Sequence, residues 1–214
     1  MSTTPIADYA LLSDCRSAAL VSREGSIDWL CLPRFDGPAV FARLLDERAG
    51  HWSIRVVGDA EIRRRYLGPT LAVETTFVTP TGTATLVDAL AVGRNERGHE
   101  LGLDSPGVVL RRATCVRGVV DMELEYAPRP EYGLVHPLLS AVDGAVIARG
   151  GADRLLLSLA APTTIQDSTA RAQFTLREGE QTHFALQHCS VWEPPQQVWT
   201  QAAIDDRLAD TLEG

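Results

Sequence analysis

The chain has 214 residues, 45% of them hydrophobic and 22% charged, and its formal net charge at pH 7 is −8. These proportions are typical of a folded globular protein, and the length is ordinary for one large β-sandwich with a substantial core. The acidic balance argues against nucleic acid and anionic membranes as general partners.

The sequence also disfavours export, membrane insertion and metal binding. It has no stretch of about 18 consecutive apolar residues, and its N-terminus, MSTTPIADYALL, lacks a basic region before a long apolar core. Four cysteines, Cys15, Cys31, Cys115 and Cys189, lie far apart without a C-x-x-C pair, which argues against zinc. We therefore expect a cytoplasmic protein without metal or cofactor, whose four reduced thiols are mostly buried.

The first predicted elements are short strands. Ile6–Leu12 and Ala18–Val21 are apolar runs, and Glu24-Gly25-Ser26 is a turn signal that separates the second run from Ile27–Leu32. This arrangement predicts a hairpin. The strand after the turn is expected to end at Pro33, because proline cannot donate to a ladder.

A polar and aromatic loop follows this hairpin. Its residues Arg34-Phe35-Asp36 place a cation, an aromatic ring and a carboxylate side by side. Apolar residues then recur at helical spacing, which predicts a short helix near residues 38–46. A loop of this composition between a strand and a helix is either a structural plug or part of a binding surface.

The segment from Ile6 to Asp46 carries a family resemblance. Its sequence, IADYALLSDCRSAALVSREGSIDWLCLPRFDGPAVFARLLD, resembles the start of the bacterial glucoamylase-like and trehalase-like enzymes of glycoside hydrolase family 15. Weaker similarity continues to about Trp199, and Gly37 stands where related sequences usually have serine. In that family this region is an N-terminal β-sandwich, and a following helical (α/α)6 barrel holds both catalytic glutamates. The resemblance implies that this chain has such a barrel as its partner, and that an α-glucoside such as trehalose binds at a shared pocket.

Strand patterns dominate the residues that follow. The clearest alternation spans residues 120–126, where four apolar side chains are expected to point inward. The intervening Asp121, Glu123 and Glu125 then form a solvated face rather than an acid–base set. Asn95–Gly107 is polar and glycine-rich without an apolar period, and it is expected to be a long loop.

The segment after this alternation contains two prolines and cannot continue the ladder. It holds Arg129 and Tyr132, and His136 follows shortly after. These three side chains either line a rim of the sandwich or pack on its edge as ordinary loop residues.

The last part of the chain changes character. The run Gln196–Glu213 places Ile204, Leu208 and Leu212 on one face, with Trp199 near its start, and this predicts an amphipathic helix. No later segment of the chain covers that stripe. We therefore expect a homodimer through this helix, or a disordered tail, rather than a monomer with an ordered, exposed helix.

Motifs of catalysis are absent from the sequence. It contains no G-x-S-x-G elbow, Walker loop, Rossmann fingerprint or H-E-x-x-H pair, so no catalytic residue is assigned. Sugar sites combine a flat aromatic face with bidentate polar groups, and Trp29, Arg34, Phe35 and Asp36 supply those types within eight residues. These four are the candidate substrate-binding residues. The alternative is that Arg34 and Asp36 pair with each other or cap the next helix, while Trp29 and Phe35 fill the core.

These observations lead to one prediction of fold and two of function. The fold is an all-β, large antiparallel two-sheet sandwich (a supersandwich) over residues 1–195, with a linker helix over 196–214 that leads to the catalytic barrel. The function is that of a non-catalytic N-terminal domain of a family 15 enzyme, inactive alone, which supports the barrel and helps to shape its sugar pocket. The alternative is a free-standing carbohydrate-binding or scaffold module.

Overall fold

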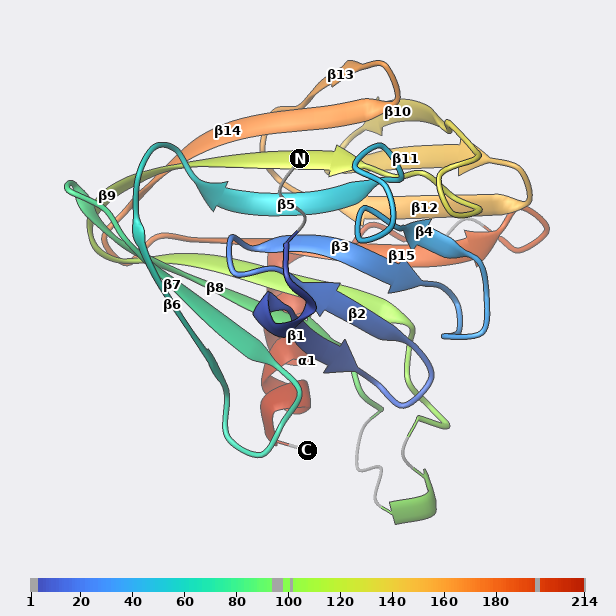
Figure 1. The fold of residues 1–214 in the computed structure, drawn as a ribbon, viewed down its shortest axis with the longest axis horizontal. Coiled ribbons are helices and arrows are strands. Elements are labelled where there is room, and N and C mark those ends of the chain that lie inside the picture. The colour runs from blue at the N-terminus through green and yellow to red at the C-terminus, as the bar shows by residue number, and fades with distance from the viewer. Residues whose placement is uncertain (1–3, 94–97, 101, 195–196, 214) are drawn as a thin grey trace.

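The computed structural model describes residues 4–93, 98–100, 102–194 and 197–213. Within these residues the protein is built from 15 β-strands, one α-helix, α1 (Gln201–Glu213), and two short 3-10 turns, η1 (Ile6–Asp8) and η2 (Gly98–Glu100). Figure 1 shows the strands stacked in two layers, with α1 behind them. The predicted all-β antiparallel sandwich is confirmed.

Two layers of strands make up the sandwich, and they share strand β9 (Val108–Ala127). The other strands of layer A are β1 (Ala10–Ser13), β2 (Ala18–Val21), β3 (Ser26–Cys31), β4 (Ala39–Phe41), β5 (His51–Val56), β13 (Thr164–Gln166) and β14 (Thr169–Arg177). The other strands of layer B are β6 (Glu61–Tyr66), β7 (Val73–Val78), β8 (Gly82–Leu90), β10 (Leu138–Val142), β11 (Ala145–Gly150), β12 (Asp153–Ser158) and β15 (Gln181–Ser190). Layer A runs β1-β2-β3-β5-β9-β14-β13 with β4 beside β3, and layer B runs β6-β7-β8-β9-β15-β12-β11-β10.

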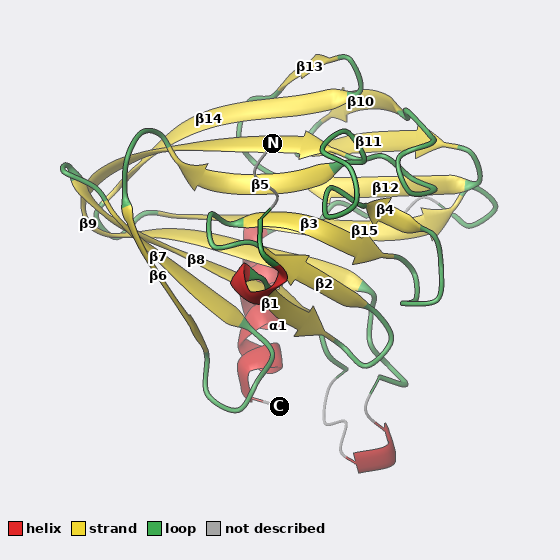
Figure 2. Ribbon diagram, in the orientation of Figure 1, coloured by secondary structure: helices red, strands yellow, loops and turns green. Residues whose placement is uncertain are grey.

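Strand β9 joins the layers because it changes partners halfway along its length. Its first half pairs with β8 and β15, and its second half pairs with β5 and β14. The strand bends near Gly118, whose φ is 74°. A Cβ atom added there would lie 2.3 Å from the carbonyl oxygen of Thr81, so both the conformation and the close approach require glycine. Figure 2 shows this bend at the left edge of the molecule.

The hydrophobic core lies between the two layers. The predicted alternation in β9 is confirmed, because Val120, Met122, Leu124 and Tyr126 are at most 1% exposed. Phe184 of β15, from the opposite layer, is also fully buried in this core. The period-two pattern therefore predicted which face of the strand is buried.

A charged pair also lies inside this core. Arg111 of β9 and Asp88 of β8 have fully buried side chains, and Nε of Arg111 donates to Oδ1 of Asp88 at 2.7 Å. The same guanidinium donates to the carbonyl oxygens of Trp52 (2.9 Å) and Gly25 (2.6 Å) in layer A. Its Cζ atom lies 4.8 Å from the centroid of the Trp52 ring. Arg111 thus connects layer B to the β2–β3 turn and to β5 of layer A.

The short helix predicted near residues 38–46 is wrong. The segment instead begins with β4, in which Phe41 pairs with Leu30 of β3. Turns follow, and the amide nitrogen of Leu44 donates to the carbonyl oxygen of Asp28 at 3.1 Å. Strand β3 offers backbone partners along this edge, so pairing between strands outweighs the helical spacing of the apolar residues.

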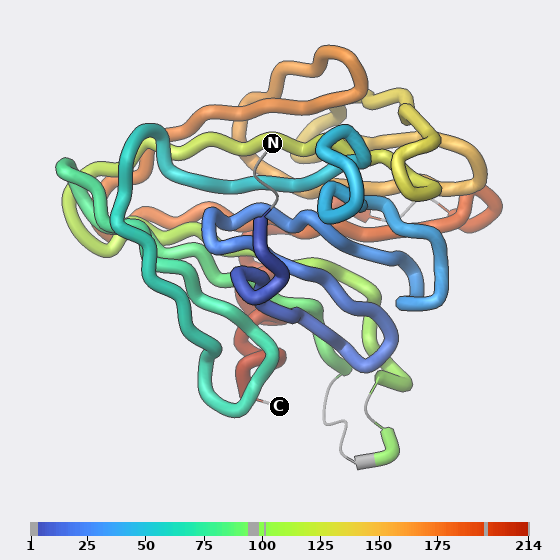
Figure 3. Tube along the Cα trace, viewed as in Figure 1, coloured from blue at the N-terminus to red at the C-terminus, as the bar shows by residue number. Residues whose placement is uncertain are grey.

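The expectation that α1 would need a partner outside the chain is also wrong. The helix is ordered over Gln201–Glu213, and its Ile204 and Leu208 are fully buried against the outer face of layer B. Their neighbours include Val87 and Leu110, whose side chains point away from the main core. Figure 3 shows this last segment returning behind the sandwich. The apolar stripe that was expected to drive a dimer is covered by the chain's own sheet.

Polar contacts fasten both ends of α1 to the same face. The side-chain amide of Gln201 accepts from the amide nitrogen of His183 (2.9 Å) and donates to its carbonyl oxygen (3.1 Å). Asp205 accepts from Nη1 of Arg112 at 2.6 Å, which lowers the pKa of that carboxyl. Near the C-terminal end, the Thr211 hydroxyl accepts from the amide nitrogen of Val92 at 3.4 Å.

Several other sequence predictions can be compared with the fold. All four cysteines are free thiols, and three of them are buried while Cys15 is exposed. None of the helices in the described part of the chain is long and apolar enough to cross a membrane. The loop predicted over Asn95–Gly107 is described only in part, because residues 94–97 and 101 lie outside the described residues. The predicted start of the tail helix at Gln196 also lies outside them.

Candidate functional site

The Arg34–Asp36 loop follows β3 and projects from the sandwich. Nε of Arg34 donates to Oδ1 of Asp36 at 3.0 Å, and both side chains are 59% exposed. This hydrogen bond lowers the pKa of the Asp36 carboxyl. Phe35 is 65% exposed and does not enter the core. Of the alternatives left open by the sequence, the Arg34–Asp36 pair is therefore present, whereas burial of Phe35 is wrong.

Trp29 lies in a different environment from the loop. It packs on the outer face of layer A over a small cluster formed by Cys31, Ala39, Ala42 and Ala49. Its ring centroid is 6.2 Å from that of Tyr132, with an angle of 45° between the rings. Trp29 therefore fills a secondary apolar cluster and forms an aromatic pair there.

The loop after β9 combines a buried anchor with exposed side chains. Arg129 is 8% exposed, and its guanidinium donates to the carbonyl oxygens of Ser168 (2.7 Å) and Asp167 (3.3 Å). Tyr132 is 50% exposed with a left-handed φ of 59°, and His136 is exposed. Arg129 is thus a structural residue of the sandwich edge, whereas Tyr132 and His136 are accessible.

A wide polar groove crosses the outer face of layer A, and we call it the layer A groove. It has a volume of about 1380 Å³ and is lined by residues of β3, β5, β9 and β14, by Arg43–Arg48 and by the N-terminal residues around Tyr9. None of the four substrate-binding candidates from the sequence is among its lining residues. The site predicted from the sequence therefore lies outside this groove.

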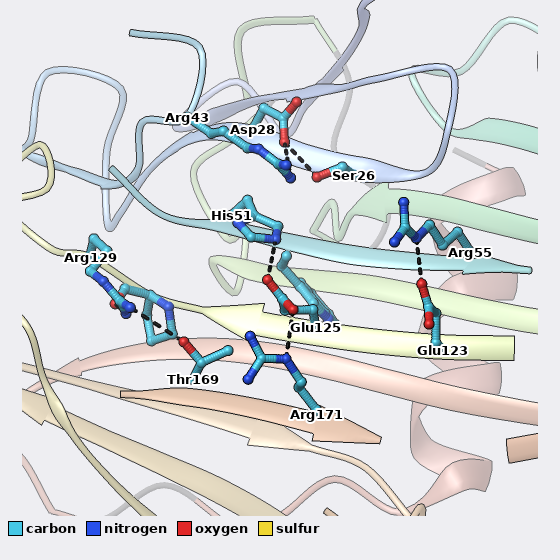
Figure 4. A network of polar contacts seen from close by, with 12 residues as sticks. Ser26, Asp28, Arg43, His51, Arg55, Glu123, Glu125, Arg129, Thr169 and Arg171 are labelled. Atoms are coloured by element: carbon cyan, nitrogen blue, oxygen red, sulfur yellow. Dashed lines mark hydrogen bonds and ion pairs between the residues drawn. The ribbon is translucent and has the colours of Figure 1, made fainter. Parts of the chain in front are cut away.

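Two groups of polar contacts between neighbouring strands lie on the floor of the layer A groove (Figure 4). In the first, Nε2 of His51 lies 3.1 Å from Oε1 of Glu125, and Nε of Arg171 donates to Oε2 of Glu125 at 2.8 Å. In the second, Nε of Arg55 donates to Oε1 of Glu123 at 2.7 Å. These pairs connect three adjacent strands, β5, β9 and β14, in register.

Asp28 forms a third polar centre at the upper wall of the groove. The register between β2 and β3 shifts at this point, and Asp28 has no partner residue on β2. Its carboxylate accepts from the hydroxyls of Tyr9 (2.8 Å) and Ser26 (2.5 Å), and Arg43 lies 4.0 Å away. Burial and the Asp28 carboxylate raise the pKa of Tyr9 to about 12, so the phenol stays protonated. A β-bulge of this kind re-aims a side chain, here into the groove.

The two glutamates of the groove correct the view of residues 121–125 as a purely solvated face. Their side chains do point away from the core, as predicted, but Glu123 and Glu125 are 31% and 35% exposed and both are ion-paired. Each is paired with an arginine, an arrangement that suits binding or stability rather than acid catalysis. No group of three or more His, Cys, Asp or Glu in the described residues is placed to hold a metal ion.

His51 makes the stability of the sandwich sensitive to acid. Burial, reinforced by Arg43, lowers the pKa of His51 from 6.5 to about 4, although Glu125 opposes the shift. Between these values the unfolded chain binds a proton that the folded chain excludes, so the free energy of unfolding falls as the pH decreases from about 6.5 to about 4. The expected loss is on the order of 3 kcal/mol.

Denaturant unfolding of the wild type and of His51→Gln at pH 7 and at about pH 4 measures this effect. The variant should lose about 3 kcal/mol less than the wild type over that range, because glutamine does not titrate. Equal losses in the two proteins would show that His51 is not the responsible group.

The chain is similar to known proteins over most of its length. A family model described as "Trehalase-like, N-terminal" matches residues 1–186. Relatives named Trehalase from Mycobacterium tuberculosis and Mycolicibacterium smegmatis are each 34% identical over 227 residues, and the match covers 98% of this chain and 33% of each relative. The chain thus spans about one third of the length of these curated relatives.

A solved structure described as a putative kojibiose phosphorylase from human microbiome is similar to this chain. The alignment covers 95% of this chain and 32% of the phosphorylase chain. Its TM-score is 0.45 and its sequence identity 8%, a likeness too low to carry a functional conclusion.

Proposed function

This chain belongs to the family of trehalase-like N-terminal domains, and from that membership we propose that it is the non-catalytic N-terminal domain of a trehalase-type enzyme of glycoside hydrolase family 15. The observation that carries the proposal is the match of the family model to residues 1–186, together with relatives named trehalase that are about three times as long. The reaction would be hydrolysis of trehalose or a related α-glucoside. The two catalytic carboxyl groups would belong to the part of the enzyme outside this chain.

The role proposed for this domain is to support a helical (α/α)6 barrel and to shape its sugar pocket. The exposed loop with Arg34, Phe35 and Asp36 supports this role, because a large aromatic ring that is 65% exposed beside a charged pair suits contact with a sugar or with another domain. Trp29 would contribute a separate aromatic surface together with the exposed ring of Tyr132.

The remaining features of the proposal concern organisation and location. Residues 1–195 would form the sandwich domain, and residues 196–214 would lead to the barrel, with α1 held on layer B as described. Four free thiols support a reducing compartment, which is the cytoplasm. Burial of the α1 stripe removes the argument for a homodimer through that helix.

The isolated chain is expected to hydrolyse no α-glucoside, because the groups that flank a scissile bond are assigned to the barrel. The assay uses the purified chain with trehalose, maltose and an aryl α-glucoside. Turnover that persists after further purification would contradict the proposal. The coding sequence that continues or neighbours this chain provides a second test, since it should encode a helical barrel with two inward-facing glutamates.

A free-standing carbohydrate-binding module is the second candidate function. The layer A groove favours it, because this chain supplies a wide polar groove of its own. Calorimetric titration of the isolated chain with trehalose and maltose separates the two candidates. Tight binding favours the module, and no binding favours a domain that acts only beside its barrel.

A further inference from the structure

The layer A groove is large enough to hold a small-molecule ligand. Its volume of about 1380 Å³ exceeds the roughly 300–1,000 Å³ of typical small-molecule pockets. Two of its polar side chains, Asp28 and His51, are only 5% and 8% exposed, so their positions are set by the fold. A ligand of two or more linked rings would fit a groove of this extent.

Four of the five arginines that line the groove are paired with lining carboxylates before any ligand arrives: Arg23 with Asp8, Arg43 with Asp28, Arg55 with Glu123 and Arg171 with Glu125. Arg55 and Arg171 each bind a glutamate through Nε, which leaves their η nitrogens available as hydrogen-bond donors. Glu123 and Glu125 keep further lone pairs as acceptors. The floor therefore offers donors and acceptors in alternation across β5, β9 and β14.

This balance discriminates between classes of ligand. The lining residues include five arginines and seven aspartates or glutamates, and burial keeps His51 neutral at pH 7. An anion would face a slight excess of carboxylates, and an ionic ligand of either sign would disturb pairs that are already satisfied. An apolar ligand would desolvate these side chains and leave their remaining donors and acceptors without hydrogen bonds. A neutral ligand rich in hydroxyl groups avoids all three costs.

We propose that the layer A groove is a binding site for a neutral saccharide of two or more rings, separate from the Arg34–Asp36 loop. Each pair of vicinal hydroxyls would receive one hydrogen bond from an arginine η nitrogen and donate one to a glutamate oxygen. Tyr9, which also lines the groove, would supply an aromatic edge and a lone pair of its hydroxyl, whose proton is donated to Asp28. The inference uses only the contacts of the groove and does not rest on the proposed catalytic partnership.

Titration of the full chain with maltotriose, followed by calorimetry and by the imidazole NMR signals of His51, tests this site. Affinity in the millimolar range is expected for so polar and open a groove. Arg171→Ala should weaken maltotriose binding by about tenfold, because it removes a charge-assisted donor and the charged partner of Glu125. Arg63→Ala, which breaks a similar ion pair with Glu61 on β6 of layer B, is the matched control and should bind as the wild type does.

The proposal is wrong if the wild type does not bind maltotriose at tens of millimolar, or if Arg63→Ala weakens maltotriose binding as much as Arg171→Ala does. It is also wrong if an anionic sugar such as glucose 6-phosphate binds more tightly than maltotriose. If Arg171→Ala does not fold, Glu123→Gln provides a second variant with the same expectation. Phe35→Ala distinguishes this inference from the proposed function. Loss of binding in that variant, with no loss in Arg171→Ala, would place the sugar at the exposed loop and leave the groove empty.

Discussion

Replacement of Arg111 by leucine is expected to lower the free energy of unfolding by about 3–5 kcal/mol, which is a large part of a typical domain's stability. The change removes the charged partner of Asp88, whose side chain is fully buried. It also leaves the carbonyl oxygens of Trp52 and Gly25 without the donor that joins the two layers. Leucine fills much of the volume of the arginine side chain. The loss of stability therefore comes from unpaired polar groups rather than from a cavity.

Two companion variants separate this effect from general damage. Arg55→Leu breaks a pair whose side chains are 53% and 31% exposed, and it should cost less than about 1 kcal/mol. The double change Asp88→Leu with Arg111→Leu should recover part of the single variant's loss, because no unpaired charge remains in the core. Denaturant unfolding monitored by circular dichroism measures all three. A loss for Arg111→Leu no larger than that for Arg55→Leu would show that the buried pair does not hold the layers together.

The pH dependence of Arg111→Leu gives an independent signature. Burial already raises the pKa of Asp88 above its ordinary value, even beside Arg111, and loss of the arginine should raise it further. A carboxyl whose pKa is raised by folding contributes stability that is present at low pH and is lost as the pH rises through the folded-state pKa. The destabilisation should therefore be smaller near pH 4 than at pH 8.

The second large effect is expected from the apolar stripe of α1. Changing both Ile204 and Leu208 to serine should lower the free energy of unfolding by at least about 4 kcal/mol, or detach the helix from layer B. Both side chains are fully buried against Val87 and Leu110, and truncation of a buried leucine or isoleucine costs about 2–5 kcal/mol. The two residues share neighbours, so their effects should not add fully.

A matched control lies on the other face of the same helix. Ala202 and Ala209 are exposed, and changing both to serine alters helix propensity without touching the contact with layer B. Hydrogen exchange of the α1 amides should rise in the Ile204 and Leu208 variant and stay unchanged in the control. Light scattering should report the same mass for both. A wild-type dimer that dissociates in the variant would instead support the association first expected from the sequence.

Contacts between residues close in sequence could be predicted at the candidate sites, whereas contacts between remote residues could not. Arg34 and Asp36 are two positions apart, so their pairing is a local matter that the sequence included among its alternatives. The partners in the layer A groove are remote: Arg55 and Glu123 are 68 positions apart, and Arg171 and Glu125 are 46 apart. The sequence pattern of residues 121–125 predicts a charged outer face of one strand. It does not predict which strands lie beside that strand. The alignment of β5, β9 and β14 decides the pairs.

The sequence by itself determined the elements whose signals are local. Period-two alternation located the buried face of β9 from Val120 to Tyr126, and the Glu24–Ser26 turn located the β2–β3 hairpin, because burial on one face and turn geometry are encoded within a few residues. Family similarity carried by Ile6–Asp46 pointed to the same sandwich. These features depend on neighbours along the chain and can be read from one segment at a time.

Only the tertiary structure decided what each apolar face contacts. Residues 39–41 belong to a segment with helical spacing in the sequence, but in the structure they pair with β3. The open edge of β3 supplies their backbone hydrogen bonds, and Phe41 is buried in the core there. The stripe on α1 looks unpartnered, yet the outer face of layer B carries Val87 and Leu110 to receive it. A face is buried when a complementary surface lies opposite, and the chain brings such surfaces together from distant positions.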